Sequence, residues 1–229
     1  MECSQCLYNN EEWACSRCIR LCCYVDKDSN TIEEVKDIYF NKVCNVNYLK
    51  KQLKDVGRVL LDNRYSNEML DGFFFPLRYY EDLRFLAAQY GAKFKLAKPR
   101  KREDNSSFYR RSSRRIFLIT NSAGFIGTWD VCRIYTHELA HAIQHNVMLA
   151  YGVNDYPATK LSEVYLFERT ADRLAYFIYK KYFYSPCTGF LTHRNFKAYR
   201  SKESLEFLYN FRKRYKRAVD DDMGVTINR

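Results

Sequence analysis

The sequence predicts an α+β fold in which helices dominate, and three features of the chain support this prediction. Apolar residues recur at helical spacing over long segments, most clearly from Val131 to Tyr151. Two short segments, Ala92–Ala97 and Arg115–Thr120, have the composition or alternation of strands. With 229 residues, 47% of them hydrophobic, the chain is long enough for one main domain with a buried core and a small appendage.

The first half of the main domain is expected to be mostly helical. Apolar positions at helical spacing predict a helical stretch from Thr31 to Asn67. A second helix is expected from Tyr79 to Tyr90, and Gly91 is expected to end it. Ala92–Ala97 alternates apolar residues with lysine, which is typical of an edge strand.

The second half of the chain is expected to contain a strand and three helices. They are, in order, the strand Arg115–Thr120, the helix Val131–Tyr151, the helix Ser162–Tyr182 and the basic amphipathic helix Ser201–Ala218. Thr128 or Asp130 can cap the first of these helices, and Gly152 can stop it.

The predicted helix at residues 131–151 carries an H-E-x-x-H motif, formed by His137, Glu138 and His141. Residues four apart lie on one face of a helix, so the two imidazoles can bind one metal ion. Glu138 projects beside them, where a carboxylate can take a proton from metal-bound water. The motif therefore predicts a catalytic zinc site with Glu138 as the general base.

A strand followed by a helix with this histidine pair resembles the core of the zincin metallopeptidases. The resemblance covers about residues 115–182 and implies a zincin-like domain over residues 27–229 with a short edge sheet. In zincins the strand lies at the edge of the active-site cleft and can pair with an extended substrate. The implied reaction is metal-assisted hydrolysis of a peptide bond of an intracellular protein.

A catalytic zinc site needs a third protein ligand. His145 continues the series of His137 and His141, but it lies about 12 Å along a helix from His137. Because zinc–nitrogen bonds are about 2 Å long, His145 could join the site only if the helix broke. We interpret His145 as a structural or cleft-lining residue.

The segment Glu168–Asp172 has E-x-x-x-D spacing on the next predicted helix, which resembles the second half of the gluzincin pattern of thermolysin-like enzymes. It is also similar to the small peptidases of the ImmA/IrrE type. The resemblance implies that Glu168 is the third ligand and that Asp172 accepts a hydrogen bond from a ligating imidazole. Glu163 is the alternative ligand. His193 and Tyr165 are candidates for contact with the oxyanion or the substrate.

Residues 1–26 form a cysteine-rich head with two C-x-x-C pairs separated by eight residues. Two such pairs predict a closed structural zinc site with the ligands Cys3, Cys6, Cys15 and Cys18. Cys22 and Cys23 could replace a ligand, and a redox pair is the competing interpretation. We therefore expect two zinc ions, one catalytic and one structural.

The net charge of +11 suggests an acidic partner, since basic runs neutralise phosphates without reading bases. The candidate nucleic-acid contacts are Arg100, Lys101, Arg102, Arg110 and Arg111. A solvated cationic surface is an equal alternative. SprT-like proteases also join an H-E-x-x-H region to a zinc finger and act on DNA-bound proteins, but there the finger follows the catalytic region.

The cysteine usage bears on the compartment. Nine cysteines, with neither a signal-peptide pattern nor an apolar run of membrane-spanning length, predict a soluble protein in a reducing compartment. We expect it to be cytoplasmic or associated with nucleic acid, and not secreted. Besides the zinc peptidase, two functions are open: a nucleic-acid-binding zinc protein with an idle H-E-x-x-H helix, and a metal-dependent regulator or toxin-like hydrolase.

Overall fold

The computed structural model describes residues 31–57, 59–60, 69–70, 73–74, 77–98, 107–120, 128–153 and 161–184. The helices are α2 (Ile32–Asp37), the π-helix η2 (Ile38–Val43), α3 (Val46–Lys50), α4 (Leu77–Gln89), α5 (Thr128–Ala150) and α6 (Leu161–Tyr182). The strands are β1 (Val59–Leu60), β2 (Met69–Leu70), β3 (Phe73–Phe74), β4 (Lys93–Ala97), β5 (Phe108–Arg110), β6 (Arg115–Ile119) and β7 (Phe183–Tyr184). The described part is α+β and helix-dominated, as predicted.

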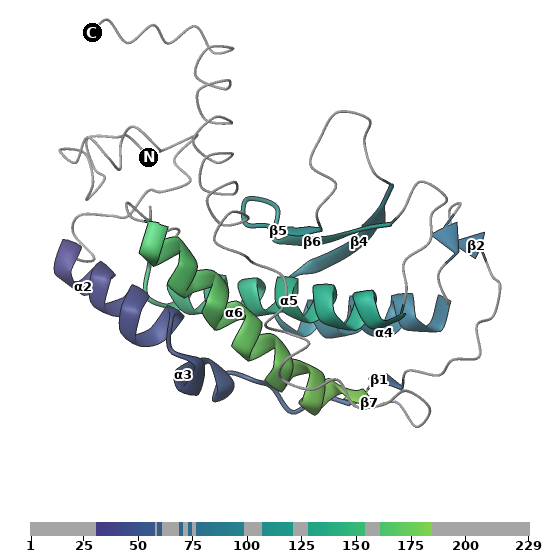
Figure 1. Ribbon diagram of the computed structural model, residues 1–229, viewed down its shortest axis with the longest axis horizontal. Helices are drawn as coiled ribbons and strands as arrows, with labels where there is room; N and C mark the ends of the chain where they lie inside the picture. The colour runs from purple at the N-terminus through teal and green to yellow at the C-terminus, as the bar shows by residue number, and fades with distance from the viewer. Residues whose placement is uncertain are drawn as a thin grey trace, which may run out of the picture.

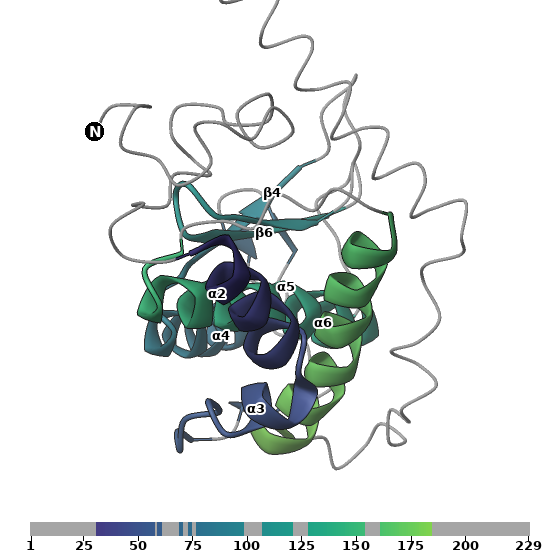
Figure 2. The same cartoon turned by 90° about the vertical axis from the view of Figure 1, so that its left-hand side faces the viewer.

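Helix α5 lies at the centre of the molecule. It packs against α6 and η2 on one side and against β6 on the other. In both views the three-stranded sheet covers one side of α5, and α6 crosses α5 away from that sheet (Figure 1, Figure 2). Leu139, Ala142 and Ile143 of α5 are almost completely buried in the core, which confirms the apolar stripe that predicted this helix.

The main sheet has the strand order β4–β6–β5, with β6 parallel to β4 and antiparallel to β5. Phe94, Leu96, Ile116 and Leu118 are buried on its inner face, since alternate residues of a strand point to opposite faces. The prediction that β4 is an edge strand is confirmed. The resemblance implied that the strand Arg115–Thr120 can pair with an extended substrate, but β6 is central in the sheet and both of its sides are paired, with β4 and with β5.

Two predicted glycine stops are confirmed. Gly91 has φ +61° and Gly152 has φ +73°, the left-handed conformation that glycine adopts without strain. After α4 the amide of Ala92 donates to the carbonyl of Ala87, and after α5 the amide of Val153 donates to that of Met148. These bonds close Schellman motifs, which satisfy the last carbonyls of each helix.

The helical stretch expected from Thr31 to Asn67 is wrong for residues 51–57 and 59–60, while residues 58 and 61–67 lie outside the described residues. Thr31 and Glu34 form a capping box that starts α2. Asn45 caps α3, which ends after five residues, and residues 59–60 form a strand parallel to β7. Leu53 and Val56 pack against the core from non-helical backbone, so their helical spacing reflected burial rather than helix.

Several predicted features lie outside the described residues. They are the cysteine head with Cys3, Cys6, Cys15, Cys18, Cys22 and Cys23, the basic residues Arg100, Lys101 and Arg102, His193, and the helix at 201–218. Among the described helices, none combines the length and apolar character needed to cross a membrane.

Gly91→Ala is expected to lower the free energy of unfolding by about 1–2 kcal/mol, because an L residue is strained in the left-handed region. The new Cβ would also approach Nη2 of Arg114 to 2.7 Å. Urea unfolding of the two proteins measures the difference. Gly57→Ala is the matched control, since a Cβ there meets open space, and an equal loss of stability in both variants would contradict this explanation.

Candidate metal centre

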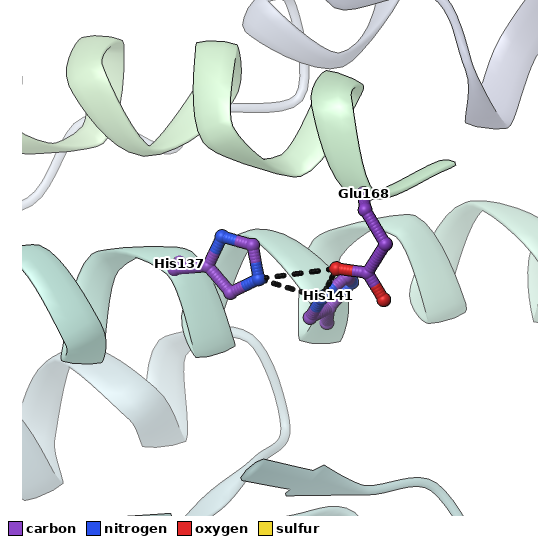
Figure 3. A group of neighbouring side chains, drawn as sticks. All are labelled: His137, His141 and Glu168. Atoms are coloured by element: carbon purple, nitrogen blue, oxygen red, sulfur yellow. Dashed lines mark hydrogen bonds and ion pairs between the residues drawn. The ribbon is translucent and has the colours of Figure 1, made fainter. Parts of the chain in front are cut away.

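Three side chains from two helices converge where α5 packs against α6. His137 and His141 come from α5 and Glu168 from α6, and their polar atoms point toward one another (Figure 3). Nε2 of His137 lies 3.0 Å from Nε2 of His141. Oε2 of Glu168 lies 3.3 Å from the first nitrogen and 3.1 Å from the second. This group could hold a metal ion.

The size of this triangle suits a small metal ion. Bonds of about 2.0–2.1 Å at tetrahedral angles place neighbouring ligand atoms about 3.3 Å apart. The three observed separations, 3.0, 3.1 and 3.3 Å, are close to that value. The side chains therefore need little movement to share one ion.

Asp172 orients the first imidazole. Its Oδ1 lies 2.8 Å from Nδ1 of His137, on the side of the ring away from the triangle. The angle departs from that of a regular hydrogen bond, although the distance is short. Because a lone pair facing a carboxylate at this distance would be repelled, we assign the ring proton to Nδ1. Asp172 lies beside a ligating imidazole, and the hydrogen bond between them stays a prediction.

Gln144 orients the second imidazole. Its side-chain nitrogen donates to the carbonyls of Val43 and Phe167, both at 3.2 Å. This fixes the amide so that its oxygen faces Nδ1 of His141 at 2.9 Å. An acceptor oxygen requires a proton on that nitrogen, so His141 also carries its proton at Nδ1.

Both Nε2 atoms therefore present lone pairs to the triangle. The third corner is a carboxylate oxygen, so three acceptors meet within 3.3 Å of one another. Their exposure is low, with His137 7% and Glu168 3% accessible. Buried acceptors that face each other repel unless a cation or added protons lie between them. A metal ion satisfies all three at once.

The ring of Phe167 packs on the face of the His141 imidazole. The two rings stack with centroids 5.0 Å apart and an interplanar angle of 13°. The guanidinium of Arg111 lies 5.2 Å from the centroid of Phe167. Arg111, which the sequence suggested as a nucleic-acid contact, thus packs on a residue that supports the candidate metal centre.

Four other residues that the sequence singled out are not among the three candidate ligands. Glu138 is buried, with 5% of its surface accessible. His145 lies outside the group, and its Nδ1 is 3.0 Å from the hydroxyl of Tyr109. Glu163 lies outside it as well, and its backbone carbonyl accepts from Tyr39. Tyr165 is 44% exposed, near the guanidinium of Arg169.

The two cysteines of the described segments do not belong to this centre. Burial raises the pKa of the Cys44 thiol to about 12 and that of the Cys132 thiol to about 12. Neither thiol belongs to the group of side chains that could share an ion.

The sequence did not point to two of the supporting residues. Gln144 lies three residues after His141, which places it on the same side of the helix, but glutamine has no ligand chemistry that would draw attention to it. Tyr109 lies on β5, a strand of three residues. Burial raises the pKa of Tyr109, so its hydroxyl keeps its proton at neutral pH beside His145.

His141→Ala should remove one metal ion per chain from the full-length protein, since it deletes one of three ligands. Elemental analysis of wild type and variant after dialysis measures the difference, and any metal in the cysteine head is common to both. Equal metal content in the two folded proteins would contradict the assignment.

Asp172→Asn should weaken metal binding about 10- to 100-fold, because the imidazole of His137 loses the carboxylate that orients it. Competition with a chromophoric chelator measures the affinity. Glu163→Gln removes the same charge from the same helix outside the ligand group and should leave the affinity unchanged. A similar loss in both variants would point to a general charge effect.

Comparison of the chain with models of protein families, with curated proteins and with solved structures gave no match. The resemblance to zincins therefore rests on the residues of the site itself.

Proposed function

We propose that the protein is a zinc-dependent metallopeptidase that hydrolyses peptide bonds in protein substrates. The observation that carries the proposal is the buried convergence of two imidazole lone pairs and one carboxylate oxygen. Two nitrogens and one oxygen form the ligand set of many catalytic zinc sites, which keep the fourth position for water or substrate. A structural zinc site would instead be closed by a fourth protein ligand, and the described residues supply three.

The chain supplies both the holding and the orienting groups of such a centre. His137, His141 and Glu168 hold the ion, while Asp172 and Gln144 keep the imidazole protons at Nδ1. When bound, zinc lowers the pKa of a coordinated water toward neutrality and polarises the scissile carbonyl.

Glu138 serves as the general base in this mechanism. It follows His137 on α5 and is buried, so its carboxylate is shielded from bulk solvent. It takes a proton from the attacking water as the new carbon–oxygen bond forms. It then gives this proton to the leaving amine nitrogen as the carbon–nitrogen bond breaks, so Glu138 ends the cycle ionised again.

An outer strand of the sheet is the natural place for an extended peptide. Because β6 is paired on both sides, it has no free edge for a peptide. We assign the pairing with substrate to β5, an outer strand next to β6. Tyr109 of β5 reaches His145, which lies one helical turn beyond His141 on α5. A peptide that paired with β5 would therefore run close to the metal ligands.

The second candidate function is a nucleic-acid-binding zinc protein whose H-E-x-x-H helix is catalytically idle. The observation in its favour is the basic outer face of the main sheet, where Lys93, Lys95 and Arg110 are exposed. The two functions differ in their dependence on Glu138, because a binding protein has no use for a general base.

Glu138→Gln should keep the bound metal and lower peptide hydrolysis by at least about 100-fold, since it removes the proton acceptor while keeping the shape of the side chain. Release of fluorescent fragments from a labelled unstructured protein measures the activity, with Glu163→Gln as the matched control. If the Glu138→Gln variant hydrolysed the substrate at the wild-type rate, the mechanism would be wrong. If wild type and variant were both inactive with metal bound, the idle-helix alternative would replace the peptidase.

A further inference from the structure

The outer face of the three-stranded sheet is both basic and aromatic. Alternate residues of the strands point away from the core, and the register pairs them across the sheet. The residues of this outer face are Lys93 and Lys95 on β4, Arg115 and Phe117 on β6, and Phe108 and Arg110 on β5. Lys93, Lys95, Phe108 and Arg110 are exposed.

The two aromatic rings form a platform on this face. Phe108 and Phe117 stack with centroids 4.9 Å apart and an interplanar angle of 24°. The guanidinium of Arg110 lies 5.4 Å and 5.1 Å from their centroids, and that of Arg115 lies 5.8 Å from Phe117. Phe108 keeps 36% of its surface accessible, although a phenylalanine gains by being buried.

The charge of the face has one sign. Four cations surround the two rings, and the strand positions of this face include no acidic residue. Within the described segments, none of the four cations forms an ion pair. The opposite face of the same strands carries Tyr109, which points to α5. The outer face is therefore separate from the candidate metal centre.

We propose that this face binds single-stranded nucleic acid. Cations contact the phosphates, while unpaired bases stack on Phe108, on Phe117 and on the guanidinium planes. Stacking platforms flanked by arginine and lysine are suited to single strands, because every base has a face to stack and duplex bases are already stacked. The proposal is independent of the peptidase activity.

Other occupants of the face fit it less well. A second copy of the chain would bring four cations against four cations, which is repulsive. A duplex would offer phosphates to the cations but no bases to the rings, so Phe108 would have no role. An acidic protein segment would neutralise the cations but would leave the two rings without a role.

Fluorescence anisotropy with the full-length protein tests the proposal, using labelled single-stranded oligonucleotides of about twelve nucleotides and the matching duplex. Phe108→Ala should weaken single-strand binding at least about fivefold without changing its salt dependence. Lys93→Gln combined with Arg110→Gln should reduce the slope of log Kd against log salt by about 1.4, the value for two lost phosphate contacts.

Matched controls separate this face from the basic chain as a whole. Phe85→Ala removes a phenylalanine that is 58% exposed on α4, and Lys36→Gln with Lys180→Gln removes two exposed cations from other helices. Both controls should bind like wild type. All the substituted side chains are on the surface, and thermal unfolding verifies that each variant folds.

Three results would overturn the proposal. They are absence of single-strand binding by wild type, binding that the sheet variants and the controls change equally, and duplex binding as tight as single-strand binding with no effect of Phe108→Ala. Light scattering of wild type and Phe108→Ala could give a fourth result that overturns the proposal. A dimer that only wild type forms would make the face an interface between copies instead.

Discussion

The structure depends on one local constraint, the meeting of three acceptors at the contact between α5 and α6, on the buried residues His137 and Glu168 and the half-buried His141. Two imidazole nitrogens and a carboxylate oxygen lie 3.0–3.3 Å apart in the core, where repulsion between lone pairs is weakly screened. A buried arrangement of this kind is stable only with a cation or extra protons at its centre. The helix pair that contributes half of the buried core residues is therefore also the pair that a metal ion would join.

Distant parts of the chain fix this arrangement. The π-helix η2 ends at Val43, whose carbonyl accepts from Gln144, and the carbonyl of Cys44 accepts from Thr170 on α6. Gln144 of α5 forms hydrogen bonds to η2, to α6 and to His141. The way these three helices pack therefore fixes the orientation of one imidazole. The outer face of the sheet is separated from this hydrogen-bond network by the buried residues of the inner face and by α5.

Much of the fold and of the site could be predicted because the signals are local. Apolar spacing located α5 and α6 within a few residues, and Gly152 located the end of α5. Spacings of four along each helix pointed to His137 with His141 and to Glu168 with Asp172. The missed features depend on non-local contacts. Gln144 gains its role from Val43, 101 residues away, and β6 is central because β5 pairs with it. Spacing also misled the prediction for residues 51–57, because Leu53 and Val56 reach the core without helical backbone.

The protonation of the two imidazoles is the most direct test of this account. The chain has four histidines, so long-range ¹⁵N–¹H spectra of the histidine-labelled, metal-free protein above pH 7 can resolve each ring. We expect His137 and His141 both to carry a proton on Nδ1, and added zinc to shift their Nε2 resonances while His145 serves as the internal reference. A ring that lacks its proton on Nδ1, or Nε2 resonances that zinc leaves unchanged, would contradict this assignment.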